Sequence, residues 1–217
     1  MELLEAINNR HSVRQYIHKP LPQDIIFALQ EKIDECNQKG KLHIQLVINE
    51  KKAFDSLMAH YEKFNGVENY IALIGKKSQY LEEKCGYYGE QLVLLAQQLG
   101  LNTCWVAMTY KKIKTAFTIK NNEKLCIVIA LGYGQNQGKA HRSKAIEDVI
   151  QTDKPVPDWF IDGVKAALLA PTAMNQQKFI FNFKNNQVSV KSGLGFYTKI
   201  DLGIVKYHFE IGANYHF

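Results

Sequence analysis

The chain has 217 residues, of which 46% are hydrophobic and 22% are charged, and its formal net charge is +6. These values are ordinary for a soluble globular protein, and the length allows one large domain with a real core. No apolar run is long enough to span a bilayer, and the N-terminus is acidic and amphipathic, unlike a secretory signal. We therefore expect a cytoplasmic protein that has no membrane segment.

Apolar residues at helical spacing predict helices, and runs of branched or alternating residues predict strands. Helices are expected around residues 3–7, leading into residue 10, from 24 to about 40, at 87–99 and 158–170, and after 201, with a short helix-like segment between 106 and 125. Strands are expected at residues 43–48, 70–75 and 125–131 and in a hairpin of 179–183 with 188–190. The hairpin is expected to turn at Asn185 and Asn186, which favour tight turns.

The order of these elements indicates the fold class. The succession of strand, helix and strand is not regular enough for a doubly wound parallel sheet. We therefore predict an α+β fold, with a mixed sheet flanked by helices, in a single domain over residues 1–217. A helix followed by a strand occurs twice, which suggests two pseudo-symmetric halves at about residues 20–110 and 155–215. Coincidence between two ordinary helix–strand units explains the pattern equally well.

Two segments carry the residues most suited to ligand binding. Residues 10–14 read Arg-His-Ser-Val-Arg, and residues 170–177 read Ala-Pro-Thr-Ala-Met-Asn-Gln-Gln. Arginine forks match phosphate oxygens two at a time, and a serine hydroxyl can donate to a third. The later segment lets backbone approach a flat ligand, while its amides offer paired donors and acceptors. Together they predict a phosphorylated planar cofactor, although residues 10–14 can also be interpreted as a solvated helix end.

Other partner classes find less support. The positive charge raises a nucleic-acid hypothesis, but the lysines are scattered among polar residues, and we expect no nucleic-acid partner. His60, His208 and His216 are separated and lack acidic partners at metal-like spacing, so no metal is expected. The four cysteines are widely spaced without a C-x-x-C pair, which favours buried thiols over disulfides.

The ordered set of motifs resembles the FMN-dependent nitroreductase family, and most of all its compact branch, in which the Pro-turn motif lies late in the chain. The matching segments are residues 10–14, 99–106, 131–134, 141–144, 171–176 and 201–213. The resemblance implies a sheet with flanking helices and FMN bound between two related units. It also implies an oxidoreductase that takes electrons from NADH or NADPH and passes them to nitro compounds or quinone-like acceptors by a ping-pong mechanism.

The resemblance also assigns cofactor-binding roles. The residues it implies for the phosphate and ribityl chain are Arg10, His11, Ser12, Arg14, Arg142 and Lys144. The residues it implies for the flavin ring are Pro171, Thr172, Ala173 and Asn175, with the backbone of Val106 and Ala107 near the N5 edge. No side chain needs to be a catalytic acid, base or nucleophile, because the flavin performs the chemistry.

The late Pro-turn motif bears on assembly. It allows one chain to complete a flavin site, so a monomer with an internal pseudo-two-fold is favoured, and a homodimer remains open. The alternative function is a non-catalytic flavin-binding or flavin-handling protein. A basic RNA-associated domain is a further, less favoured alternative.

Overall fold

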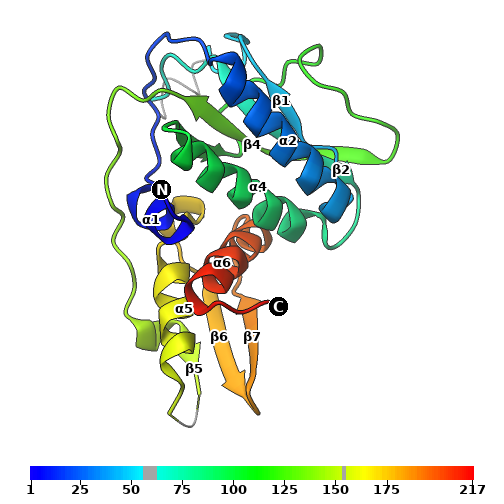
Figure 1. Cartoon of the computed structure of the whole chain (residues 1–217). Helices are drawn as coiled ribbons and strands as arrows, with labels where there is room; N and C mark the ends of the chain where they lie inside the picture. Colours follow the sequence, from blue (N-terminus) through cyan, green and yellow to red (C-terminus); the bar gives the residue numbers. More distant parts are fainter. Residues whose placement is uncertain (56–62, 153–154) are drawn as a thin grey trace. The chain divides into compact units, whose positions relative to one another are not determined.

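The computed structural model describes residues 1–55, 63–152 and 155–217 (Figure 1). The chain divides into two compact units. The first unit consists of Met1–Asn9, Glu82–Gln91 and Ala140–Phe217, and the second of Arg10–Leu81 and Leu92–Lys139. Each unit has its own sheet. No helix in the described part of the chain is long and apolar enough to cross a membrane.

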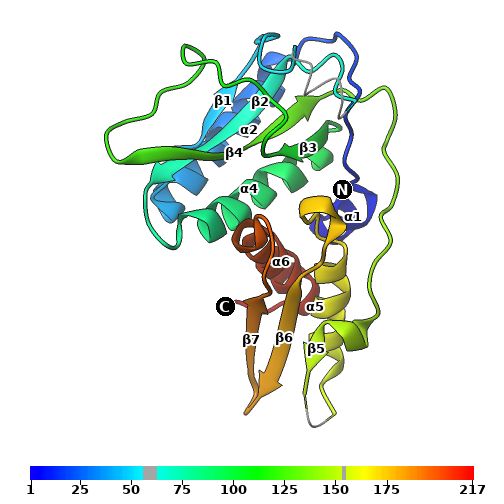
Figure 2. The same cartoon turned by 180° about the vertical axis from the view of Figure 1, so that it is seen from behind.

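The second unit contains a four-stranded antiparallel sheet in the order β1-β2-β4-β3. The strands are β1 (Gln45–Val47), β2 (Asn69–Lys76), β3 (Asn102–Val106) and β4 (Glu123–Gly132). Helix α2 (Gln23–Gly40) covers one face of this sheet, in front of it in Figure 1 and behind it in Figure 2. Ile71 of β2 lies opposite Ile129 of β4, and both side chains are fully buried.

Irregular segments cover the other face of this sheet. Side chains alternate between the two faces of a strand, so Tyr70 and Ala72 point away from the face that holds Ile71. Both belong to a core cluster to which loop residues such as Val13, Tyr16 and Phe54 contribute. The irregular segment after β3 adds Phe117 and packs further apolar residues against the same cluster, namely Tyr110, Ile113, Ala116 and Ile119.

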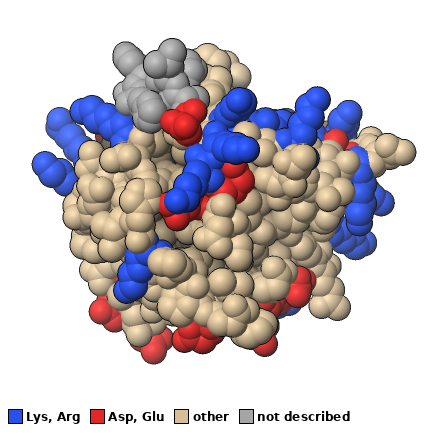
Figure 3. All heavy atoms as spheres, turned by 90° about the horizontal axis from the view of Figure 1, so that it is seen from above, with Lys and Arg blue, Asp and Glu red and all other residues tan. Residues whose placement is uncertain are grey.

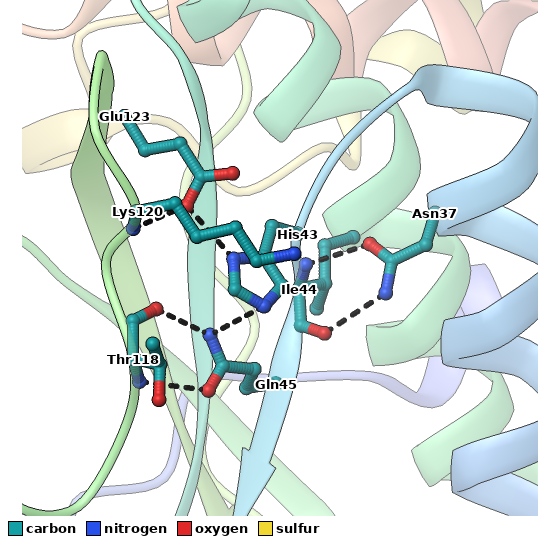
Figure 4. A network of polar contacts seen from close by, with 7 residues as sticks. All are labelled: Asn37, His43, Ile44, Gln45, Thr118, Lys120 and Glu123. Carbon is teal, nitrogen blue, oxygen red and sulfur yellow. Dashed lines mark hydrogen bonds and ion pairs between the residues drawn. The ribbon is translucent and has the colours of Figure 1, made fainter.

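A polar network fixes the start of β1 (Figure 4). Asn37 of α2 accepts from the Ile44 backbone N–H at 2.6 Å and donates to its carbonyl at 3.0 Å. Gln45 makes the same kind of paired contact with the backbone of Thr118, at 2.9 and 2.7 Å. His43 Nδ1 lies 2.8 Å from Glu123 Oε2. Burial alone would raise the pKa of Glu123, but hydrogen bonds from His43 and from a backbone N–H outweigh it and lower that pKa.

The first unit contains a three-stranded sheet in the order β5-β6-β7. Its strands are β5 (Ile150–Gln151), β6 (Phe179–Lys184) and β7 (Gln187–Ser192). The sheet is mixed, because β5 is parallel to β6 and β7 is antiparallel to it. Asn185 and Asn186, with φ of 52° and 59°, make the hairpin turn that the sequence predicts.

Helices α5 (Asp158–Leu168) and α6 (Thr198–Ala213) pack against one another in this unit. A Cβ on Gly163 of α5 would lie 2.6 Å from the Phe209 ring of α6, so only glycine permits this approach. The Phe181 ring of β6 stacks on the same Phe209 ring, with centroids 4.7 Å apart. The unit also includes α1 (Leu3–Asn9), the 3-10 turns η1 (Ile146–Asp148) and η2 (Ala173–Asn175), and the first part of α4 (Leu81–Gln98).

The predicted α+β class is confirmed, with two sheets, but several elements differ from expectation. Strands β3 and β5 were not predicted. Helix α4 begins six residues before the expected residue 87, and α6 begins at Thr198. Strand β1 is shorter than 43–48, because the Asn37 side chain takes both backbone hydrogen-bonding groups of Ile44. The expected helix-like segment between 106 and 125 is wrong: its apolar residues reach the core from turns. The bounds of the two units differ from the sequence halves, and the relation between those halves stays a prediction.

Candidate cofactor-binding site

Two motifs that lie about thirty residues apart in the sequence are joined by hydrogen bonds in the first unit. The Asn175 amide donates to the backbone carbonyl of Arg142 at 2.9 Å, and the Gln177 amide donates to the same carbonyl at 2.9 Å. Lys144 meets Gln177 twice, once through its backbone N–H and once through its ammonium group, both at 2.9 Å. The basic motif 141–144 and the Pro-turn motif 171–177 therefore form one assembly.

The same assembly is anchored to the end of helix α5. His141 and Ser143 both contact the backbone carbonyl of Leu168, at 2.9 and 3.1 Å. The Thr172 hydroxyl accepts from the Gln177 backbone N–H at 3.1 Å. Arg142 is exposed, and its guanidinium has no ion-pair or hydrogen-bond partner among the described residues. The arrangement holds the Arg142 backbone in place and leaves its charged fork available for an anion.

The Pro-turn contains three residues in the left-handed backbone region. Met174, Asn175 and Gln177 have φ of 51°, 54° and 45°. Such conformations cost non-glycine residues of order 1–3 kcal/mol each and persist where the surroundings enforce them. Hydrogen bonds from the turn to neighbouring segments supply that enforcement here.

A buried carboxylate supplies part of the same support. Asp201, in the first turns of α6, is 4% exposed and accepts from the Ala173 backbone N–H at 2.9 Å and from Gln176 Nε2 at 2.6 Å. Burial raises the pKa of Asp201 to about 6, and the two hydrogen bonds only partly oppose that rise.

In the second unit, residues 10–14 run along β3, the edge strand of the four-stranded sheet. Ser12 forms a parallel bridge with Thr103, and the Val13 N–H donates to the Thr103 carbonyl at 3.0 Å. The buried Tyr16 hydroxyl donates to the Val13 carbonyl at 2.7 Å, and burial raises its pKa well above the ordinary value. These contacts fix the backbone on either side of Ser12 and Arg14.

The loop after β4 closes against the same segment. Asn102 accepts from the Gly134 N–H at 2.9 Å and donates to Gln137 Oε1 at 3.0 Å, which braces the loop. Gly138 has φ of 74°, and a Cβ there would lie 2.7 Å from the Cβ of His11. A side chain at position 138 would therefore displace the His11 backbone.

The predicted site residues of the second unit differ in their exposure. Arg10 is 3% exposed, whereas Arg14 is exposed and its Cζ lies 5.8 Å from the centroid of the Phe64 ring. Val106, at the end of β3, is buried, so it can offer only its backbone, and Ala107 is partly exposed. The interpretation of residues 10–14 as a solvated helix end is wrong, because α1 ends at Asn9 and the segment is extended.

The structure brings the predicted residues together in two groups. The first unit unites Arg142, Lys144, Pro171, Thr172, Ala173 and Asn175. The second unit holds Arg10, His11, Ser12, Arg14, Val106 and Ala107. Sequence reasoning missed Gln177 and Asp201, which hold the Pro-turn. A lone carboxylate in the apolar run Ile200–Val205 was the available signal for Asp201.

The histidines fit structural roles where they are described. His208 is fully buried, with Nε2 2.9 Å from Glu90 Oε1 and Nδ1 3.1 Å from the Ala166 carbonyl. It is therefore a core histidine with partners, whereas His60 lies outside the described residues. Within the described ranges, no cluster of three or more histidine, cysteine, aspartate or glutamate residues could hold a metal ion.

Comparison with solved structures identifies the fold. A nitroreductase from Thermotoga maritima, described as putative, has a TM-score of 0.66 and 22% identity, with 98% of this chain and 83% of that chain covered. A putative nitroreductase from Desulfovibrio desulfuricans, solved in complex with FMN, has a TM-score of 0.55 and 16% identity over 72% of this chain and 99% of that chain. A putative NADH oxidase from Clostridium acetobutylicum has a TM-score of 0.52 and 22% identity, over 65% and 96%. The fold is therefore of the nitroreductase type.

The sequence itself gives the family. The chain belongs to the family described as "Putative TM nitroreductase", whose sequence model matches residues 2–213. The resemblance seen in the motifs is thus confirmed over nearly the whole chain, and the protein is an oxidoreductase of this family. A comparison with curated proteins gives no match.

Proposed function

We propose that the protein is an FMN-dependent NAD(P)H oxidoreductase that reduces nitro compounds or quinone-like acceptors by a ping-pong mechanism. Family membership supports the reaction class, and the FMN complex of the Desulfovibrio desulfuricans relative supports the cofactor. The name of the Clostridium acetobutylicum relative, "Putative NADH Oxidase", supports a nicotinamide dinucleotide as electron donor.

The observation that carries the proposal is the placement of the arginines. Only three of the chain's 27 basic residues are arginines, and they are Arg10, Arg14 and Arg142. All three therefore lie in the two motifs assigned to the cofactor phosphate. Arginine binds phosphate oxygens in pairs, which lysine cannot do. Every other basic residue of the chain is a lysine, so arginine occurs only in these two motifs.

The residues present fit a phosphorylated flavin. Arg14 and Arg142 are exposed, and neither has an ion pair with a described carboxylate. Lys144 is held by a neutral carbonyl, so its positive charge is not compensated. Each charge-assisted hydrogen bond to the phosphate would contribute about 1.5–3 kcal/mol.

The remaining predicted residues have other tasks. When bound, FMN would supply the hydride and electron transfer between NADH or NADPH and the acceptor. Thr172, Ala173 and Asn175 would border the ring, with their backbone held by the Pro-turn, and the backbone of Val106 and Ala107 would lie near its N5 edge. The ping-pong mechanism would require one ring face to stay open, so that donor and acceptor could stack there in turn.

A small molecule is the partner that the surface suits. The face drawn in Figure 3 carries lysine and arginine in several separate groups, with acidic residues among them. Extended basic stripes mark nucleic-acid binders, whereas this pattern fits a solvated surface with local anion sites.

The absorption spectrum of the purified protein, reconstituted with FMN, tests the proposal. We expect a bound flavin spectrum that bleaches on addition of NADPH or NADH without oxygen and recovers on addition of a nitroaromatic compound or a quinone. A flavin spectrum that no dinucleotide bleaches would instead identify a flavin-binding protein without this activity. Failure to bind FMN at all would overturn the proposal.

A further inference from the structure

Asp201 has an unusual position for a carboxylate. It lies in a run of apolar residues on α6, is 4% exposed, and directs both oxygens at one turn. One oxygen accepts from the backbone of Ala173 at 2.9 Å and the other from the Gln176 side chain at 2.6 Å. Both donors belong to the Pro171–Gln177 turn, which contains the predicted ring-bordering residues.

The ionised Asp201 carboxylate does not stabilise the folded chain. Burial raises the pKa of Asp201 to about 6, so its ionised form is less stable in the folded chain than in the unfolded chain. The neighbouring positions Ile200, Leu202 and Ile204 are apolar, and an apolar residue would suit this stretch of helix. The retained charge therefore points to a role in holding the turn.

Gln176 extends the influence of Asp201 to a second segment. Its Nε2 atom also donates to the Phe196 carbonyl at 2.7 Å. The segment before α6 exposes 94% of Leu194 and 77% of Phe196. The nearby Lys178 ammonium donates to the Leu194 carbonyl at 2.8 Å. Through Gln176, Asp201 thus also holds residues 194–196, a segment that exposes two large apolar side chains.

We propose that Asp201 is a positioning residue, whose carboxylate holds the Pro171–Gln177 turn in the conformation that binds the flavin ring. This inference rests on the proposed function. Asp201 would not touch the flavin itself, but would act through the backbone of Ala173 and the side chain of Gln176. Three left-handed residues in the turn explain why such a brace is needed.

Two substitutions separate the roles of the two oxygens. Asp201→Ala removes both acceptors, whereas Asp201→Asn keeps one oxygen for the Ala173 N–H and places an amide group opposite Gln176. Asp162→Asn is the matched control, because Asp162 is exposed on α5 of the same unit and its carboxylate contacts Lys165 at 3.0 Å.

Hydrogen exchange followed by mass spectrometry on the FMN-free protein gives a readout that needs no cofactor. We expect the backbone amides of residues 172–177 to exchange about tenfold faster in Asp201→Ala, with an intermediate effect in Asp201→Asn and none in Asp162→Asn. FMN titrations followed by flavin fluorescence should show the same order, with affinity about tenfold weaker in Asp201→Ala. The urea midpoint of Asp201→Asn at pH 7 should not fall. If Asp201 served only the stability of the fold, its replacement would lower that midpoint.

Each other result has a definite meaning. Unchanged exchange in residues 172–177 overturns the inference, and so does faster exchange with unchanged FMN affinity. A parent protein that binds no FMN overturns the proposed function, and the positioning role with it. If Asp201→Ala does not fold, Asp201→Asn and Gln176→Leu carry the test, and both should show faster exchange and weaker FMN binding than Asp162→Asn.

Discussion

The ammonium nitrogen of Lys144 lies 2.9 Å from the backbone carbonyl of Gln177, and the Gln177 side chain accepts from the Lys144 backbone N–H, also at 2.9 Å. This reciprocal contact joins the basic motif to the Pro-turn. Because Gln177 is 2% exposed, its amide cannot exchange these partners for water.

Gln177→Ala should therefore destabilise the protein by about 3 kcal/mol, from the loss of three side-chain hydrogen bonds of about 1 kcal/mol each. The bonds are those with Arg142, Asn175 and the Lys144 backbone. Urea unfolding at pH 7 measures the change. Gln187→Ala is the control, because Gln187 is exposed at the start of β7, and its effect should stay within about 0.5 kcal/mol. Equal effects of the two substitutions would contradict the role given to Gln177.

The sequence predicted the elements well because burial in this protein follows simple periodicity. Strand β2 is buried except at its last residue, Lys76, and β7 alternates, as their residue patterns indicate. The helix-like segment predicted after β3 is wrong because its apolar residues have helical spacing but pack on the core from turns.

Within the candidate site, local motifs revealed the residues that carry charge or a turn. They did not reveal Gln177 and Asp201, whose importance comes from partners far along the chain. The partner of Asp201 Oδ1 is the backbone of Ala173, 28 residues earlier. A backbone donor leaves no mark on the sequence, so such contacts need coordinates.

Arg14→Ala should weaken FMN binding about tenfold or more, because it removes one or two charge-assisted hydrogen bonds to the phosphate. Arg14→Lys should recover only part of the loss, since an ammonium group cannot bind two oxygens as a fork. Lys19→Ala removes the same charge from the same exposed segment and should leave the affinity nearly unchanged. Flavin fluorescence titration at fixed salt compares the three variants, and equal losses for Arg14→Ala and Lys19→Ala would indicate charge alone.

The Glu123 carboxylate should make stability depend on acid pH. The pKa of Glu123 is lowered in the folded chain by His43 and the Lys120 backbone, despite the opposing effect of burial. Its contribution is therefore present above the unfolded value of about 4.5 and is lost as the pH falls below it. Glu123→Gln should cost about 1–2 kcal/mol at pH 7 and progressively less toward pH 3. Urea unfolding across this range measures the difference, with the exposed Glu31→Gln as a control that should show none.

Asp201 should have the opposite effect. Its folded pKa of about 6 lies above the ordinary 3.8, so the folded state holds its proton more tightly and stability falls as the pH rises from about 4 to about 6. The decrease due to this group is about 3 kcal/mol. The parent minus Asp201→Asn difference in unfolding free energy isolates it from other titrating groups. A difference that does not change with pH between 4 and 7 would show that burial does not raise this pKa.

One chain should supply the whole flavin site, with one FMN per chain. Helices α2 and α5 both begin after a proline, Pro22 and Pro157, in an extended conformation (φ −60°, ψ 153° and φ −70°, ψ 155°), and the relation between the two halves stays a prediction. The sequence contains one Arg-x-Ser-x-Arg motif, at residues 10–14, so a second phosphate clamp is not expected.

Co-expression of Arg14→Ala and Arg142→Ala chains with different tags tests this arrangement, because the two substitutions fall in different motifs. If each chain builds its own site, every chain in the mixture carries a damaged clamp, and FMN affinity stays as low as in either variant alone. If the two motifs of one site come from different copies, a mixed dimer regains one intact site, and doubly tagged protein binds FMN with parental affinity at half of its sites. Sedimentation of the parent protein with bound FMN, read at flavin wavelengths, gives the second measurement. Flavin that travels with a monomer supports a site within one chain, whereas flavin found only on a dimer, together with recovery in the mixture, would refute it.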